Sequence, residues 1–292
     1  MRACQDVRVV RNMVTAGRPG LRHIWRGNTI AAAVGLLLLS VLSSACRGAG
    51  GGAQPTVGPT ASGSPEALAK VLVLDFEQSM PQLAAGAKIP SGIPNGPLGE
   101  VATTGREAQP LQLVTGRDGH GHAVAFPAQC PPAHAKTCPK EIIEVYPATT
   151  LAPGTHDFGW GASVRLKQEQ TAKGSNIIQK GFSLGGGSQW KLQVDGAQGH
   201  PSCVLVGMKE TLIHEAFADF SISDGSWHDV TCRRSGDELV ITVDGAHKGT
   251  AHIAKGLTIA PAGPVRIGGK DLKADNDQFF GSLDDIYVET HR

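Results

Sequence analysis

From Val71 onward, hydrophobic residues recur at every second position of the chain. Apolar residues alternate with small or polar ones through 160–167, 190–195 and 239–243. A period of two places successive side chains on opposite faces of a strand, so each segment predicts a β-strand with one buried face. Further strands are expected at 71–76, 142–146, 176–181, 203–206, 227–233, 265–267 and 281–289.

Turn-forming residues separate these segments. Asp195-Gly196, Ser235-Gly236-Asp237 and Asp244-Gly245 are typical of tight hairpins, because glycine readily adopts positive φ. Residues 66–70 weakly favour one short helix, and no long amphipathic helix pattern follows them. Many short strands with regular turns favour an all-β fold, so we expect an antiparallel jelly-roll sandwich over 71–292.

The first 46 residues follow a different pattern. An uncharged apolar run occupies 30–42, and small residues lead from it to Ala45-Cys46. Six arginines precede the run: Arg2, Arg8, Arg11, Arg18, Arg22 and Arg26. This order predicts an export signal that starts at Met1 or Met13. The apolar run is near the short limit for spanning a bilayer, so an uncleaved membrane anchor is the alternative.

Cys46 suggests how the exported chain is held at the cell envelope. Residues 42–46 resemble a bacterial lipobox, whose cysteine is lipidated, although Ser43 stands where that motif usually has an aliphatic residue. Cleavage after Ala45 without lipidation is the competing interpretation. Residues 47–70 are rich in Gly, Ala, Pro, Ser and Thr and predict a flexible linker. We therefore expect a monomer outside the membrane, tethered through its N-terminus.

Charge is unevenly distributed along the chain. The whole sequence has a net charge of +1, whereas residues 71–292 carry 19 Lys and Arg against 24 Asp and Glu, a net charge of −5. The positive charge therefore belongs to the N-terminal segment. Without a basic stripe in the exported part, nucleic acid is not an expected partner.

Four of the six cysteines lie in the exported part: Cys130, Cys138, Cys203 and Cys232. An even number in an oxidising compartment predicts disulfides, with three possible connectivities. We favour Cys130–Cys138, which closes a short proline-rich loop, and Cys203–Cys232, which joins two strand-like segments. A zinc site is the alternative, but the sequence has no CxxC spacing.

Hydrolase motifs are incomplete in this chain. His214-Glu215 begins an HExxH string, but Ala218 replaces the second histidine. Retaining glycosidases need two carboxyl groups close together, and Glu141 and Glu144, three residues apart, fall on opposite faces of a strand. We therefore predict no catalytic residues and no enzymatic activity.

Several aspartates are candidate ligands of a structural calcium ion, which prefers hard oxygen donors. Asp275 and Asp277 cluster before the last predicted strand, and Asp75, Asp284 and Asp285 lie on the first and last strands. The alternative for the cluster is a solubilising loop. No other cofactor is expected.

The aromatic and histidine side chains of the strands have simpler expected roles. Trp160, Trp190 and Trp227 alternate with polar residues and are expected in the core. His228 is expected to be an ordinary sheet residue. His120 and His122 flank a glycine and are interpreted as solvated polar residues, with a metal site as the alternative.

Short motifs in a fixed order resemble one family. They lie at 74–77, 157–158, 163–166, 177–181, 226–230, 239–245, 265–269 and 280–286. The order and the residues of these motifs are similar to those of laminin-G-like domains in the concanavalin A-like lectin/glucanase superfamily. The similar segments include Asp157-Phe158, the Trp-His segment and Gly281-Ser-Leu-Asp-Asp-Ile286. The resemblance covers about residues 71–290. Thr242 stands where that family usually has a tyrosine.

The resemblance implies a jelly-roll sandwich that binds glycans or proteins on a concave face or on rim loops, with calcium in some members. We therefore expect a non-catalytic module for a carbohydrate or an envelope protein. A glycan-active hydrolase of the same superfamily and a purely structural adhesion module are the alternatives. Aromatic residues make up only 5% of the chain, so few side chains can stack on sugars.

Overall fold

The computed structural model describes residues 67–77, 82–105, 108–131, 134, 137–148 and 151–291. The predicted export signal, Cys46 and most of the predicted linker lie outside the described residues. Contacts within the chain group Pro65–Arg292 into one compact unit. Within the described ranges, no helix is long and apolar enough to cross a membrane.

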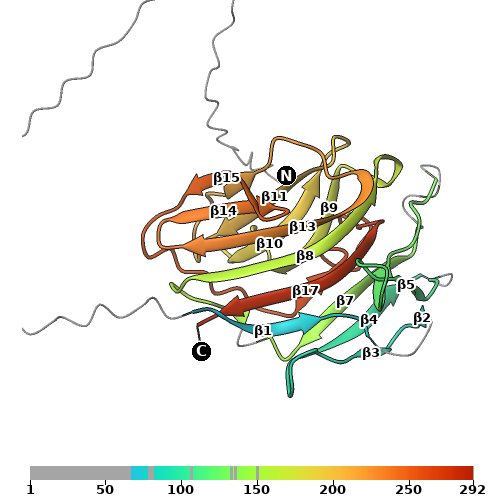
Figure 1. The fold of residues 1–292 in the computed structure, drawn as a ribbon. Coiled ribbons are helices and arrows are strands. Elements are labelled where there is room, and N and C mark those ends of the chain that lie inside the picture. The colour runs from blue at the N-terminus through green and yellow to red at the C-terminus, as the bar shows by residue number, and fades with distance from the viewer. Residues whose placement is uncertain are drawn as a thin grey trace, which may run out of the picture. The chain divides into compact units, whose positions relative to one another are not determined.

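Two antiparallel sheets make up the described part of the chain (Figure 1). Sheet A has the order β15 (Ala246–His252), β14 (Glu238–Val243), β13 (Asp224–Ser235), β8 (Phe158–Lys167), β17 (Ser282–Thr290), β6 (His122–Ala125), β5 (Leu111–Thr115) and β2 (Gln82–Leu83), and β1 (Ala69–Leu74) also pairs with β17. Sheet B has the order β12 (His214–Phe217), β11 (His200–Val206), β10 (Gln189–Asp195), β9 (Gly174–Gly181), β16 (Val265–Ile267), β7 (Lys140–Tyr146), β4 (Leu98–Thr104) and β3 (Lys88–Ile89). The predicted all-β antiparallel sandwich is confirmed.

The sheets pack face to face around one hydrophobic core. Trp160 of β8 and Trp190 of β10 are fully buried, and their ring centroids lie 5.6 Å apart. Phe158 stacks on Trp160 at 4.8 Å between centroids. The alternating apolar positions of each strand therefore meet between the sheets, as the period of two predicts.

Both predicted disulfides are present. Cys203 of β11 bonds to Cys232 of β13, so this bridge crosses the core from sheet B to sheet A. Cys130 bonds to Cys138 in the connection between β6 and β7.

Two predictions about individual segments are wrong. Trp227 is partly exposed, because Val230 and Cys232 take the core face of β13 and alternation turns Trp227 outward. Its ring lies against the guanidinium of Arg165, 4.8 Å from the ring centroid. The short helix favoured at residues 66–70 is not formed at Ala69 and Lys70. These two residues begin β1 because they pair with Thr290 and Glu289 of β17.

Candidate functional site

A line of mostly polar side chains crosses all eight strands of sheet B. Each member lies directly opposite the next in the strand register. In order from β12 to β3 the members are Glu215, Val204, Lys191, Gln179, Arg266, Glu144, Glu100 and Lys88. We call these residues the polar row.

The polar row lies on the outer face of sheet B. Trp190 and Leu192 belong to the core, so Lys191 between them points to the opposite face. Ile143 and Val145 place Glu144 on that face in the same way. The row therefore points away from the core, and within it Gln179 and Val204 are only 1% and 4% exposed.

Lys191 occupies the most sheltered cationic position in this row. Burial lowers the pKa of Lys191, against the opposing effect of the carboxylates of Asp195, Asp277 and Glu215. Among the residues that the structure describes, no hydrogen-bond acceptor or ion-pair partner contacts its ammonium group. Its N–H donors are thus free to meet a ligand.

A hydrogen-bonded cluster lies beside Lys191. Asp195 accepts hydrogen bonds from the Ser202 hydroxyl at 3.2 Å and from the side-chain amide of Gln193. The same amide lies 3.3 Å from the Ser202 hydroxyl. Burial raises the pKa of Asp195, while nearby Lys191 opposes the shift. These contacts fix the carboxylate in place as an oriented acceptor.

Two exposed aromatic rings accompany the row near β7 and β9. Arg266 Nε donates to Glu144 at 2.9 Å, and its guanidinium lies 5.4 Å from the ring centroid of Phe182. The Tyr146 hydroxyl donates to the other oxygen of Glu144 at 3.1 Å. Tyr146 is 48% exposed and Phe182 is 41% exposed. Rings of this kind can stack on the apolar face of a sugar, next to charged hydrogen-bonding groups.

Glu141 and Glu144, the two carboxylates considered as a catalytic pair, do not have the arrangement found in a retaining glycosidase. Glu141 is only 1% exposed and lies on the opposite face of β7 from Glu144. Burial raises the pKa of Glu141 to about 7. His214 lies on strand β12, whereas the HExxH zinc motif requires a helix.

The five calcium candidates do not converge. Lys270 lies 3.7 Å from Asp275 and 2.9 Å from Asp277, and Asp75 lies beside Gly92. Across the described ranges, no group of three or more His, Cys, Asp and Glu side chains is placed to hold a metal ion. A calcium site therefore stays a prediction from the sequence.

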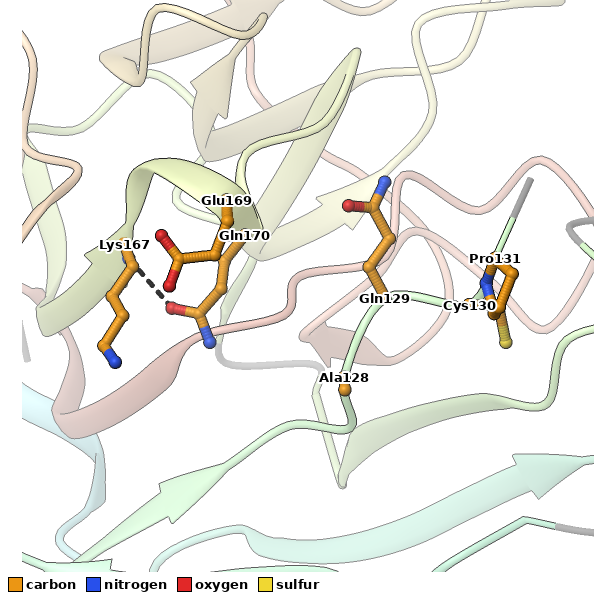
Figure 2. A pocket seen from close by; sticks show the side chains of 7 residues that line it. All are labelled: Ala128, Gln129, Cys130, Pro131, Lys167, Glu169 and Gln170. Carbon is orange, nitrogen blue, oxygen red and sulfur yellow. Dashed lines mark hydrogen bonds between the residues drawn. The ribbon is translucent and has the colours of Figure 1, made fainter.

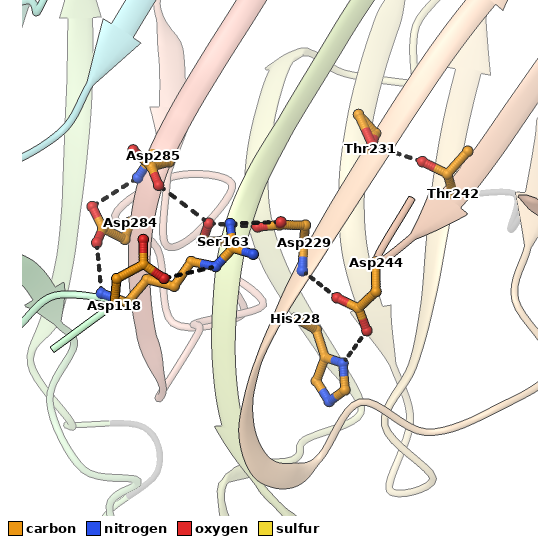
Figure 3. A network of polar contacts seen from close by, with 10 residues as sticks. Asp118, Ser163, His228, Asp229, Thr231, Thr242, Asp244, Asp284 and Asp285 are labelled. Carbon is orange, nitrogen blue, oxygen red and sulfur yellow. Dashed lines mark hydrogen bonds and ion pairs between the residues drawn. The ribbon is translucent and has the colours of Figure 1, made fainter. Parts of the chain in front are cut away.

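The other two candidates, Asp284 and Asp285, belong to a polar network over sheet A (Figure 3). Asp284 accepts a hydrogen bond from the Arg117 backbone at 3.1 Å, and Arg117 also pairs with Asp229 at 2.6 Å. Ser163 donates to Asp229 at 2.7 Å. Burial raises the pKa of Asp284 to about 6, although two backbone donors oppose the shift. The network attaches the β5–β6 loop to the sheet.

His228 lies on β13, as expected of a sheet residue. Its two ring nitrogens lie 2.8 Å from Asp244 and 3.2 Å from Asp224. Burial alone would lower the pKa of His228, but the hydrogen bonds and charges of the two aspartates together raise it. The histidine therefore holds the Asp244 turn against β13.

A pocket beside the β6–β7 connection is a second candidate site (Figure 2). It is lined by Ala128, Gln129, Cys130, Pro131, Lys167, Glu169 and Gln170. Gln170 accepts from the Lys167 backbone at 2.8 Å and donates to the Phe280 carbonyl at 2.7 Å. Because its amide already holds η3 (Gln168–Gln170) in place, the polar row is the stronger candidate site.

Sequence reasoning missed the polar row as a site. Lys191, Arg266 and Glu144 occupy polar positions within strands that were predicted, so the signal was their alternation with core residues. Their alignment depends on a strand order that joins segments far apart in the sequence.

Comparisons with known proteins bear on the fold. Domain 4 of AbnA, a GH43 extracellular arabinanase from Geobacillus stearothermophilus solved in complex with arabinotriose, is 12% identical, with a TM-score of 0.54 over 77% of this chain and 94% of that domain. The binding domain of botulinum neurotoxin DC, solved with rat synaptotagmin II, is 13% identical, with a TM-score of 0.51 over 75% of this chain and 47% of that chain. No curated protein matches the chain.

A family model settles the membership of the chain. The model described as concanavalin A-like lectin/glucanases superfamily matches residues 144–291, which is half of the sequence. The matched region contains β8 to β17 and part of β7, and so includes Lys191, Arg266 and Glu144 of the polar row. The chain belongs to the concanavalin A-like lectin/glucanases superfamily.

Proposed function

We propose that this chain is an exported, non-catalytic module that binds a carbohydrate along the polar row. The observation that carries the proposal is the alignment of row side chains across all eight strands of sheet B. Neighbouring strands lie about 4.8 Å apart, so such a row offers a regular series of contacts to an extended saccharide.

The chemistry of the row suits a neutral, hydroxyl-rich ligand. Lys191 and Arg266 are donors, and Glu144 and Glu215 are acceptors, so both signs of charge are distributed along the row. A strongly anionic or cationic ligand would meet repulsion at some of these positions. Tyr146 adds an exposed ring at the side of the row.

Two further observations support the proposal. The disulfides Cys130–Cys138 and Cys203–Cys232 are typical of a protein exposed to an oxidising compartment. The arabinanase domain, which has a similar fold, was solved in complex with arabinotriose. A saccharide ligand is thus compatible with this fold.

Binding is tested on a glycan array with the full chain and a Lys191→Met variant. Methionine keeps the length of the side chain and removes its donors, so the variant should lose tenfold or more in affinity, since a hydrogen bond to a charged group contributes about 1.5–3 kcal/mol. Lys248→Met, at an exposed position on β15, is the matched control and should bind like the parent chain. An array without any bound glycan, or equal binding by Lys191→Met, would refute the proposal.

The non-catalytic part is tested separately. We expect no release of reducing sugar when the full chain is incubated with the polysaccharide that it binds, since Glu141 and Glu144 lie on opposite faces of β7. Turnover that is lost in Glu144→Gln would instead identify a hydrolase.

A further inference from the structure

Six of the seven exposed large hydrophobic side chains among the described residues lie at one end of sheet B. They are Leu98, Tyr146, Phe182, Leu184, Met208 and Leu212. The strands are antiparallel, so the start of β4, the end of β7, the β9–β10 loop and the β11–β12 loop all meet at this end. The seventh side chain, Phe217, lies at the opposite end, where it is paired with Ser202. We call the end with the six side chains the apolar end.

Two loops form the projecting part of the apolar end. The Lys209 backbone in the β11–β12 loop donates to the Gly186 carbonyl in the β9–β10 loop at 3.2 Å, which joins the two loops. Leu184 is 72% exposed, and a Cβ atom added at Gly185 or Gly186 would meet nothing within 4 Å. The leucine therefore stands at a tip that projects into solvent.

Cationic side chains flank these tips. Lys209 and Lys255 are exposed and line a shallow hollow together with Met208. In the described part of the chain, no carboxylate lies within 4 Å of either ammonium group. The neighbouring Glu210 lies 3.5 Å from His214. The hollow thus has two lysines against one carboxylate, Glu210, whereas residues 71–292 as a whole carry a net charge of −5. This local excess of cations favours an anionic partner at this end.

We infer that the apolar end docks on an anionic lipid bilayer. Leu184, Met208 and Leu212 enter the boundary between headgroups and acyl chains, and Lys209 and Lys255 lie beside lipid phosphates. Apolar insertion combined with basic residues near the surface is the established physical basis of peripheral membrane binding. Projecting loops that carry a few exposed apolar side chains suit insertion into a fluid layer, whereas a protein partner needs a broad area of about 800 Å².

The inference is tested with a Leu184→Trp variant of the full chain in lipid vesicles. With phosphatidylglycerol vesicles, the emission of the introduced indole should move to shorter wavelength and be quenched by brominated acyl chains. Phe217→Trp, at the opposite end of the sheet, is the matched control and should show neither change. The four native tryptophans are common to both variants and give the same background.

Charge is tested on the same reporter. Adding Lys209→Glu and Lys255→Glu to the reporter should raise the amount of anionic lipid needed for half of the spectral change at least tenfold. Each basic residue near such a surface contributes about 1 kcal/mol to membrane binding. An emission spectrum that anionic vesicles do not alter would overturn the inference and leave a protein as the occupant of the apolar end. Equal changes with phosphatidylcholine vesicles would overturn the assignment of anionic lipid.

Discussion

Glu141 is a buried acid in a polar cluster with Gln278. One of its carboxyl oxygens accepts from the Gln109 backbone at 2.8 Å, while the other is buried with no partner within the described residues. Gln278 holds the adjacent backbone, donating to the Glu141 carbonyl at 2.7 Å. Because burial raises its pKa to about 7, Glu141 favours the protonated form below that pH in the folded chain.

This environment predicts a dependence of stability on pH. In the unfolded chain Glu141 loses its proton near pH 4.5, and in the folded chain near pH 7, so its contribution to stability falls as the pH rises between these values. The loss amounts to about 3 kcal/mol. Glu141→Gln should therefore match the parent chain at pH 4 and be more stable at pH 8, as measured by chemical denaturation. Glu238→Gln, an exposed control, should leave the pH profile unchanged. Equal profiles for Glu141→Gln and the parent chain would contradict this account.

At the scale of elements, the Cys203–Cys232 bridge connects the two sheets across a separation of 29 residues, whereas Cys130–Cys138 closes a loop of 8. Loop-closure entropy in the unfolded chain makes the longer bridge the more stabilising one. Its position in the core adds to this effect, since both of its cysteines are fully buried.

We predict that replacing Cys203 and Cys232 together by alanine lowers the free energy of unfolding by about 3–4 kcal/mol. The matched double replacement of Cys130 and Cys138 should cost about 1 kcal/mol less by the same dependence on loop length. Denaturant titration of the two variants compares them directly. The reverse order of stabilities would show that the inter-sheet bridge is not the principal covalent constraint.

Ten strands were predicted from the sequence because one of their faces is strongly apolar. Several edge strands lack such a face and were not predicted. β15 (Ala246–His252) is largely exposed and carries polar or small residues at most positions, and β2 and β3 have two residues each. These strands form because a neighbouring strand offers unpaired backbone groups. Local hydrophobic periodicity does not reveal this pairing.

The site was less predictable than the fold. Lys191 and Gln179 face each other across the consecutive strands β9 and β10, but Arg266 meets Gln179 and Glu144 only through the pairing of β16 with β9 and β7. That pairing brings together segments separated by many residues, so no local pattern encodes it. Trp227 shows the same limit, because its face depends on which side of β13 meets the core.

At the scale of the whole molecule, the first prediction concerns Cys46, which lies outside the described residues. Purification from membranes should give a chain that starts at Cys46 and carries a diacylglyceryl group, detected by intact mass. A Cys46→Ala variant should lack this mass and be released from membranes. A mature chain that starts at Cys46 without lipid would contradict lipidation and leave simple cleavage after Ala45.

The calcium hypothesis makes its own prediction. If Asp75, Asp275, Asp277, Asp284 or Asp285 hold a structural calcium ion, a chelator should lower the melting temperature, because ligand binding to the folded state adds to its stability. Readdition of calcium should restore the original value. A melting temperature that the chelator leaves unchanged would remove the hypothesis.

The central claim is that an extended saccharide lies along the polar row. Isothermal titration of the full chain with oligosaccharides of increasing length, taken from the glycan that the array identifies, tests it most directly. The row predicts that affinity increases with length as successive sugars reach Lys191, Arg266 and Glu144, and that Lys191→Met removes part of this increase. Affinity that is independent of length, or unchanged in Lys191→Met, would contradict the claim.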